Sequence, residues 1–409
     1  MYDFIIIGGG ISGLYMHMKL LDKTKNIVLL EQYNNFGGRI YQYNDKTYNV
    51  SFPAGAARFN KSHIRVINLL KQFQLLDFRS DRGGSAEIDF IDVKQQFDVS
   101  FKNDNGFKYI QKVLDVMKNE DENILMNLTF SEYAQKVLSK EELEFMLIAS
   151  GYSGQLKYMN AKDAYSLFST GIRTDVNFWG GKYHLLVDKI VNYLKNQGGK
   201  MMKNTQVKDV LKNDDNFEVI LDNKTLHTKQ VIFCTPKSSL LNFSCLSSIK
   251  SILKNSITCK ALCRVYALFN ENEEWLLNFN KKTVVNNALR YIIPMNPQKG
   301  LIMISYTDDK YTDYWKNKKD DENDLKVSIV RLIKQSLNIE VSQPKKVYVN
   351  YWNCGVAYWN KGVNSEQISE IITHPLPNTY ICGENYSRQQ SWVEGALESC
   401  DRCLKHMKQ

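Results

Sequence analysis

The opening thirteen residues constrain the fold of this 409-residue chain more than any other stretch. Within residues 2–7, the run from Phe4 to Ile7 is apolar and rich in β-branched side chains, a composition typical of a short buried strand. They lead into Gly8, Gly10 and Gly13, and a helical pattern begins at Leu14. In a strand–turn–helix unit, glycines at this spacing permit a tight turn, let a pyrophosphate approach the backbone, and let helix and strand pack closely.

The next apolar run completes a dinucleotide-binding unit. Residues 26–30 predict a second parallel strand, and Glu31 stands at its end. An acid about 20 residues past the glycines is the expected partner of an unphosphorylated adenosine ribose, with the phosphates held at the helix N-terminus. A glycine turn without a ligand would leave Glu31 unexplained.

A second glycine pair follows the acid, in the run Phe36-Gly37-Gly38-Arg39-Ile40. Its spacing from Glu31 resembles the flavin-dependent amine oxidase family, which includes monoamine, polyamine and L-amino acid oxidases. In that family the glycine pair and its arginine also contact FAD. Adjacent glycines let the backbone approach a ligand, and Arg39 can counter the charge of a pyrophosphate. The alternative is an ordinary turn with a surface arginine.

The C-terminal stretch resembles the flavin-binding signature of the same family. A predicted strand meets Gly383 and Glu384, and a helix begins near Trp392. The resemblance implies that Glu384 contacts the ribityl chain and that the amides of 393–396 face the pyrimidine end of the flavin. A helix N-terminus there would stabilise negative charge on reduced flavin. Trp392 takes the place of an aromatic that faces the substrate; a buried core tryptophan is the alternative.

The segment Gly55-Ala56-Ala57-Arg58-Phe59 resembles L-amino acid oxidases, in which the arginine binds the substrate carboxylate. A guanidinium suits this task because its planar fork pairs bidentately with a carboxylate. Arg58 could instead form a structural salt bridge or contact the flavin.

Two further positions in the middle of the chain are assigned by resemblance. The backbone of Val207 matches the family's contact with the adenine. Arg264 stands where the family usually has a lysine that holds a water near flavin N5; Lys260 lies earlier but spaces less well. This departure leaves open whether oxygen or another acceptor reoxidises the flavin, and a structural role for Arg264 is equally consistent with the sequence.

The segment from Asn353 to Trp359 carries a cysteine and two large aromatics. Cys354 lies near the position at which monoamine oxidases bond the flavin to a cysteine, but its surroundings do not match that motif, so we expect non-covalent FAD. Tyr358 or Trp359 could form one wall of the substrate site, or could pack in the core.

Composition excludes several other classes of protein. The net charge is +9, but the lysines are spread along the chain and read as solvated surface rather than a nucleic-acid patch. The first strand begins at Tyr2, which leaves no room for a signal peptide, and no stretch has about 18 uninterrupted apolar residues. The eight cysteines lack paired metal-ligand spacing, so we expect no metal, reduced thiols and a soluble, cytoplasmic protein.

The fold expected is α/β, of the amine oxidase type: a discontinuous Rossmann-like FAD-binding domain with a second substrate domain of mixed sheet plus helices. The FAD-binding domain is predicted to comprise residues 1–78, 180–258 and 376–409. The substrate domain would comprise 79–179, a largely helical block, and 259–375, which contains predicted strands at 287–294 and 301–306.

The resemblance predicts an FAD-dependent L-amino acid oxidase, in which hydride passes from the α-carbon to flavin N5. Oxygen is reduced to hydrogen peroxide, and the imino acid hydrolyses to a 2-oxo acid and ammonia. An amine or polyamine oxidase, a dehydrogenase or a desaturase of the same fold are the alternatives. Expected partners are an amino acid or amine and O2, without nucleic acid or membrane, and a homodimer is left open.

The predicted catalytic residues are Arg58, Trp392, Arg264 and Tyr358. The predicted FAD contacts are Gly8, Gly10, Ile11, Ser12, Gly13, Glu31, Gln32, Gly37, Gly38, Arg39, Ala56, Ala57, Arg58, Val207, Gly383, Glu384, Trp392, Val393 and Ala396.

Overall fold

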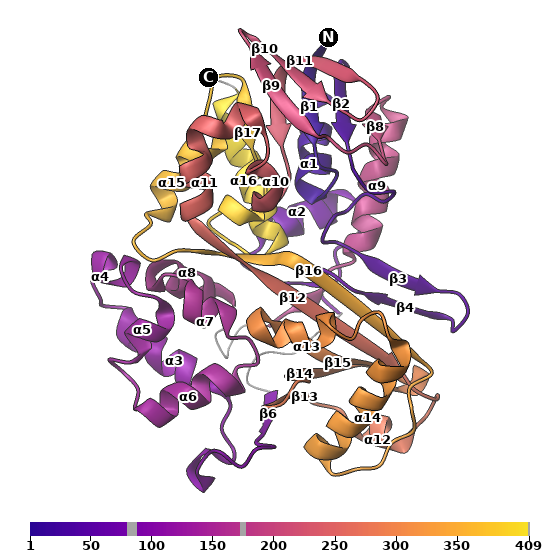
Figure 1. Ribbon diagram of the computed structural model, residues 1–409, viewed down its shortest axis with the longest axis vertical. Helices are drawn as coiled ribbons and strands as arrows, with labels where there is room; N and C mark the ends of the chain where they lie inside the picture. The colour runs from indigo at the N-terminus through magenta and orange to yellow at the C-terminus, as the bar shows by residue number, and fades with distance from the viewer. Residues whose placement is uncertain (80–87, 172–176, 408–409) are drawn as a thin grey trace.

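A seven-stranded sheet forms the upper half of the molecule in Figure 1, where both chain termini also lie. The computed structural model describes residues 1–79, 88–171 and 177–407. The strand order is β8-β2-β1-β11-β10-β9, and β17 pairs with β11. The strands are β1 (Tyr2–Ile7), β2 (Ile27–Leu30), β8 (Lys200–Met202), β9 (Asp209–Asn213), β10 (Asn216–Ile220), β11 (Thr225–Phe233) and β17 (Thr379–Ile381).

The centre of this sheet is parallel and buried on both faces. β1 pairs in parallel with β2 and β11, and β11 pairs in parallel with β17. Strands covered on both faces read as continuous apolar runs, which is why residues 27–30 are all buried. Helix α1 (Ile11–Leu20) packs between this sheet and helices α9 (Tyr183–Asn196) and α16 (Val393–His406), and nine of its ten residues are buried.

A second sheet of six strands lies below the first, in the order β16-β12-β15-β14-β13-β6. Its two longest strands, β12 and β16, run from the upper half of the molecule into the lower half (Figure 1). The strands are β6 (Ile88–Ile91), β12 (Ile257–Leu268), β13 (Lys282–Val285), β14 (Tyr291–Asn296), β15 (Leu301–Asp308) and β16 (Lys346–Trp359). Two short ladders complete the sheets, β3 (Gln42–Asp45) with β4 (Val50–Pro53) and β5 (Arg58–Phe59) with β7 (Trp179–Gly180).

Short helices cluster beside the second sheet, on the left of Figure 1, and share a core with it. They begin at residues suited to capping: Thr129 and Ser139 each form a capping box with the glutamate three residues later. The cluster comprises α3 (Gly106–Met117), α4 (Glu122–Met126), α5 (Phe130–Ala134), α6 (Lys140–Ala149), α7 (Gly154–Tyr158) and α8 (Ala161–Gly171). The other helices are α2 (Ile64–Gln72), α10 (Lys237–Leu240), α11 (Lys250–Asn255), α12 (Glu274–Asn278), α13 (Thr312–Lys316), α14 (Glu322–Leu337) and α15 (Ser365–Thr373).

These elements confirm the predicted α/β fold, and they refine it in places. The strands expected at 287–294 and 301–306 are adjacent and antiparallel, as β14 and β15, but β14 begins only at Tyr291, after a turn. Residues 353–359, which carry the cysteine and the two aromatics, form the end of strand β16. Ala86 and Glu87, expected to begin a strand, lie outside the described residues, and the domain boundaries stay a prediction.

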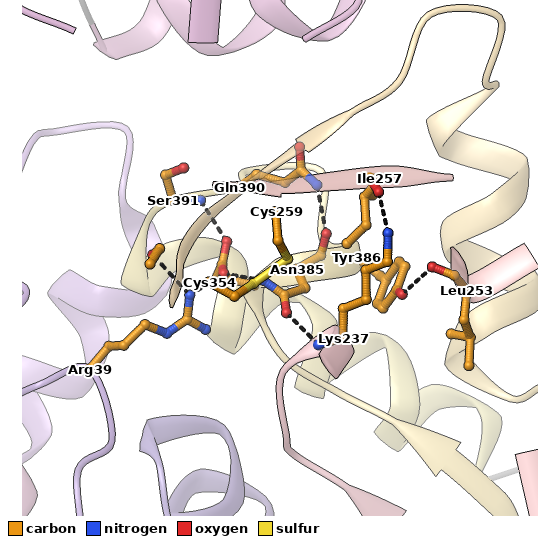
Figure 2. Close-up of a disulfide and its surroundings, with 12 residues drawn as sticks. Arg39, Lys237, Leu253, Ile257, Cys259, Cys354, Asn385, Tyr386, Gln390 and Ser391 are labelled. Carbon is orange, nitrogen blue, oxygen red and sulfur yellow. Dashed lines mark hydrogen bonds and ion pairs between the residues drawn. A yellow bond between two sulfur atoms is a disulfide. The ribbon is translucent and has the colours of Figure 1, made fainter. Parts of the chain in front are cut away.

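The cysteines correct one expectation from the sequence. Cys259 of β12 and Cys354 of β16 form a disulfide, with their Cα atoms 5.1 Å apart (Figure 2). The expectation of eight reduced thiols is therefore wrong for this pair, while the other six cysteines are free. Sequence could not show the pairing, because 95 residues separate the two and only the register of β12 on β16 brings them together.

Across the described part of the chain, no helix combines the length and apolar character that crossing a membrane would require.

Candidate functional site

The two glycine turns meet at the carboxyl ends of β1 and β2. The N–H of Gly37 donates to the carbonyl of Gly9 at 2.9 Å, and a β-carbon on Gly38 would lie 3.3 Å from the Cα of Gly10. Among the described residues, no atom lies within 4 Å of the position that a β-carbon on Gly10 would take. Backbone is thus presented to open space here, as the approach of a pyrophosphate requires.

The other two glycines of the first motif are demanded by packing. Gly8 has a φ of 106°, a conformation that side chains disfavour, and a β-carbon there would lie 2.6 Å from the carbonyl oxygen of Cys234. A β-carbon on Gly13 would lie 1.9 Å from the carbonyl oxygen of Gly8. These two residues set the turn and the helix–strand contact, while Gly10 faces the ligand side.

Glu31 is buried at the end of β2, beside the glycine turn. Its carboxylate accepts the N–H of Gly9 at 2.7 Å and that of Tyr33 at 2.9 Å, and its carbonyl accepts the N–H of Thr205 at 2.8 Å. Val207 lies two residues beyond Thr205, so the predicted ribose and adenine contacts belong to one neighbourhood. Gln32 is exposed.

Arg39 and Glu384 form an ion pair that joins the second glycine turn to the C-terminal motif. Arg39 also donates to the carbonyl of Gly355 at 3.2 Å. The other oxygen of Glu384 accepts the N–H of Ser391 at 2.8 Å, and Asn385 donates to the carboxylate at 2.6 Å. Figure 2 shows Arg39, Asn385 and Ser391 around the disulfide, so the guanidinium expected to face a pyrophosphate here pairs with a carboxylate.

Two long helices begin at this site without a capping side chain. Neither Gly10, before α1, nor Trp392, before α16, makes a side-chain cap hydrogen bond. The helices approach each other where the Ser12 hydroxyl donates to the Ala396 carbonyl at 3.4 Å. Uncapped helix N-termini offer free N–H groups and a positive dipole end to an anion.

Two buried hydroxyls mark the same surface. Thr235 Oγ1, near the Gly8 turn, and Ser391 Oγ, just before α16, have no hydrogen-bond partner among the described residues. Buried hydroxyls are normally hydrogen-bonded, so both of these are free to bond to a ligand or to water. Open backbone at Gly10 and Gly383, two uncapped helices and these hydroxyls fit a dinucleotide with a flavin ring.

Two of the predicted substrate residues, Trp392 and Arg58, pack against the same aromatic ring. Trp392 stacks on Phe178 with ring centroids 5.7 Å apart and planes 5° apart, and the guanidinium of Arg58 lies 4.9 Å from the Phe178 ring centre. His63 packs against Trp392 at 4.8 Å, and burial lowers the pKa of His63 to about 4, so this imidazole is neutral near pH 7. The structure therefore brings Arg58 and Trp392 together through a third residue.

Arg264 lies among tyrosines rather than among acids. Its guanidinium donates to the carbonyl of Gly55 and, at 3.2 Å, to the hydroxyl of Tyr306, whose ring it also covers. Tyr152 packs edge-on against Tyr306 and against Tyr291. This cluster lies next to the segment that carries Arg58.

Tyr358 lies in the core shared by the helical cluster and the second sheet, which also contains Tyr291 and against which Tyr306 and Trp392 pack. It is 1% exposed, next to Gly154 and Asp308. The last five residues of β16, 355–359, are all buried, and strand alternation places Tyr358 in one core and Trp359 in another. Both side chains are thus packed in cores, and the substrate-wall role of Tyr358 stays a prediction. Lys260, the other candidate for the lysine position, pairs with Asp309 at 3.0 Å and covers the ring of Tyr158.

Sequence reasoning missed the aromatic residues that surround the two arginines. No local motif in the sequence distinguishes Phe178 or the three tyrosines from ordinary core residues. The presence of Trp392 and Arg58 could have indicated an aromatic residue such as Phe178 at this site, because a guanidinium and an indole both favour an aromatic neighbour.

Comparisons with known proteins agree with this geometry. The profile of the family described as flavin containing amine oxidoreductase matches residues 11–403. An uncharacterized protein of Acanthamoeba polyphaga mimivirus is 22% identical over 98% of this chain and 93% of its own length. Aplysianin-A of Aplysia kurodai is 22% identical over 98% of this chain and 89% of its own. The structure of a putrescine oxidase double mutant superposes with a TM-score of 0.78 at 14% identity, over 100% of this chain and 99% of that one.

Proposed function

The chain belongs to the flavin-containing amine oxidoreductase family, and on that premise we propose that its substrate is an L-amino acid. The overall reaction converts the amino acid, O2 and water into a 2-oxo acid, ammonium and hydrogen peroxide. When bound, FAD supplies the two-electron acceptor for the hydride that leaves the α-carbon. The protein supplies position, charge and the exclusion of water.

The main support for the proposal is that the charge of Arg58 has no carboxylate partner among the described residues. Its guanidinium stacks on Phe178 and, among the residues that the structure describes, contacts no carboxylate. Its charge is therefore available to an anion beside Trp392. A bidentate pair with the α-carboxylate would fix the amino acid, so that its α-carbon lies at a constant position relative to the N-terminus of α16.

The aromatic residues around Arg58 and Trp392 also suit an amino acid substrate. Burial raises the pKa of Tyr152 and of Tyr291 above the ordinary tyrosine value, so both remain neutral hydroxyls that can donate a hydrogen bond. A diamine or polyamine would instead favour a carboxylate near Trp392. The described side chains that stack around Trp392 are the rings of Phe178 and His63.

The test compares amino acids with amines on one enzyme. Peroxide release is measured for the L-amino acids and for simple amines, with wild type, Arg58→Met and Arg58→Lys. Loss of charge-assisted hydrogen bonds worth about 1.5–3 kcal/mol predicts roughly a 10- to 100-fold fall in kcat/KM on amino acids for Arg58→Met.

Lys61→Met is the matched control, since Lys61 is exposed, three residues along the chain. It should leave turnover unchanged. Activity on simple amines that survives Arg58→Met, without any activity on amino acids in the wild type, would contradict the proposal and favour an amine oxidase.

A further inference from the structure

Arg264 is a buried cation without a counter-ion. Its side chain and backbone together are 9% exposed, and both of its hydrogen bonds, to the Gly55 carbonyl and the Tyr306 hydroxyl, are to neutral groups. Its Nε is buried and has no hydrogen-bond partner among the described residues, and no carboxylate there lies within ion-pair distance. Because an uncompensated buried charge is costly, a position like this favours an anionic ligand.

Arg58 lies close to the same place. Burial raises the pKa of Tyr152, while the positive charges of Arg58 and Arg264 both act in the opposite direction. The carbonyl of Gly55 accepts a hydrogen bond from Arg264, and Gly55 is three residues from Arg58. The Cα atoms of Gly55 and Arg58 are therefore at most about 11 Å apart. We call Arg58, Arg264, Tyr152, Tyr291 and Tyr306 the two-arginine cluster.

The cluster also contains a donor that nothing in the described chain uses. The hydroxyl of Tyr152 is buried without a hydrogen-bond partner among the described residues, and its ring lies 4.9 Å from that of Tyr306 and 5.4 Å from that of Tyr291. Two cations, one free hydroxyl and flat apolar rings match a small molecule with two negative ends joined by a short methylene chain.

We propose that the two-arginine cluster binds both carboxylates of an amino dicarboxylic acid. Arg58 holds the α-carboxylate, Arg264 together with Tyr152 holds the side-chain carboxylate, and the tyrosine rings cover the methylene groups between them. The inference rests on the carboxylate role proposed for Arg58 and adds a substrate class to it. The competing role for Arg264 is to act on the bound flavin alone.

The experiment measures binding without turnover. Holoenzyme is titrated with dicarboxylates that carry no amine, succinate and glutarate, and with butyrate and pentanoate as monocarboxylates of matching length. Perturbation of the flavin absorbance reports each Kd. We expect at least one dicarboxylate to bind more tightly than the monocarboxylate of the same length. Its Kd should be at least tenfold lower, either for succinate against butyrate or for glutarate against pentanoate.

Variants assign the two ends of the ligand. Arg264→Met should raise the Kd of the dicarboxylate to that of the monocarboxylate and leave the monocarboxylate within about twofold. Arg58→Met should weaken both classes. Lys260→Met is the control. Lys260 lies on the same strand as Arg264, but its charge is paired with Asp309, so this variant should preserve the dicarboxylate preference. Thermal melting of each variant checks the fold.

The outcomes separate the inference from the proposed function. Equal binding of both classes, or an Arg264→Met variant that weakens both classes alike while shifting the flavin midpoint potential, overturns the inference and leaves amino acid oxidation standing. A preserved preference for dicarboxylates in an enzyme whose flavin no amino acid reduces supports the binding assignment and overturns the proposed function.

Discussion

Phe178 and Trp392 lie parallel, with ring centroids 5.7 Å apart, although more than 200 residues separate them in the chain. The Phe178 ring is also the surface on which Arg58 rests, at 4.9 Å. The position of the cation that we assign to the substrate carboxylate therefore depends on a residue that contributes no polar group.

Replacing Phe178 with leucine should loosen Arg58 without removing its charge. A cation–π contact is worth about 0.5–2 kcal/mol, so we expect KM for the amino acid to rise roughly 2- to 30-fold, with a smaller change in kcat. Steady-state kinetics on the best amino acid substrate measures this, and Phe178→Tyr should restore KM. Phe78→Leu, at an exposed ring outside the stack, is the control. A change confined to kcat would contradict the positioning role.

Two glycines of the same motif should respond differently to alanine. Gly13→Ala places a β-carbon against the backbone oxygen of Gly8 and should destabilise the fold by roughly 1–3 kcal/mol or more. Gly10→Ala meets no described atom within 4 Å, so the apoprotein should keep its stability but lose FAD affinity at least tenfold. Urea unfolding of the apoproteins and flavin content by visible absorbance distinguish the two. Equal flavin content in Gly10→Ala and wild type would place the pyrophosphate elsewhere.

His17 should make stability fall in mild acid. Its ring lies in the core with both nitrogens unpaired among the described residues, and burial lowers its pKa to about 4. The unfolded chain, with a pKa of about 6.5, then binds more protons than the folded one between these values, so stability is lost as the pH falls through this window.

The slope for one such group is at most about 1.4 kcal/mol per pH unit. His17→Met keeps the volume roughly constant and removes the titration, so chemical denaturation at pH 7.5 and pH 5 should show a smaller loss of stability than in wild type. His63, with a pKa lowered by burial in the same way, should retain part of the effect. His227→Gln, at an exposed position on β11, should leave the loss unchanged; an unchanged loss in His17→Met would contradict the prediction.

The disulfide can be counted directly. The chain has eight cysteines, so thiol titration of the denatured, unreduced protein should give six, and peptide mapping should recover Cys259 linked to Cys354. In the chain-entropy view a crosslink across a loop of this size stabilises by about 4–5 kcal/mol, so a reductant should lower the melting temperature. The Cys354→Ala variant should melt at the reduced value with or without reductant. Eight titratable thiols would show that the bond is absent.

The parts of the site that sequence predicted are those made by short stretches of chain. The first glycine turn, Glu31 and the start of α16 each follow from local patterns of strand, turn and helix. The three tyrosines around Arg264 come from the loop between α6 and α7 and from two strands. Only the pairing of β14 with β15 and the packing of that loop against them assemble the group. The same holds for the disulfide, which depends on the pairing of two strands far apart in the chain.

Tyr358 shows the limit of reasoning from alternation alone. The sequence marks residues 358 and 359 as neighbours on opposite faces of a strand, and either face could have met the substrate. Because the end of β16, residues 355–359, passes between two cores, both of its faces are covered there. No pattern of apolar residues distinguishes such a stretch from one with a single ligand-facing side.

The Arg39–Glu384 pair joins the second glycine turn to the C-terminal motif, and the contact of Ser12 with Ala396 joins the first helix to the last. During synthesis, the ribosome releases the first of these partners long before the second. Cofactor capture must therefore be a late event in the life of a nascent chain: a stalled polypeptide ending before residue 380 would expose its glycine turn but retain no flavin.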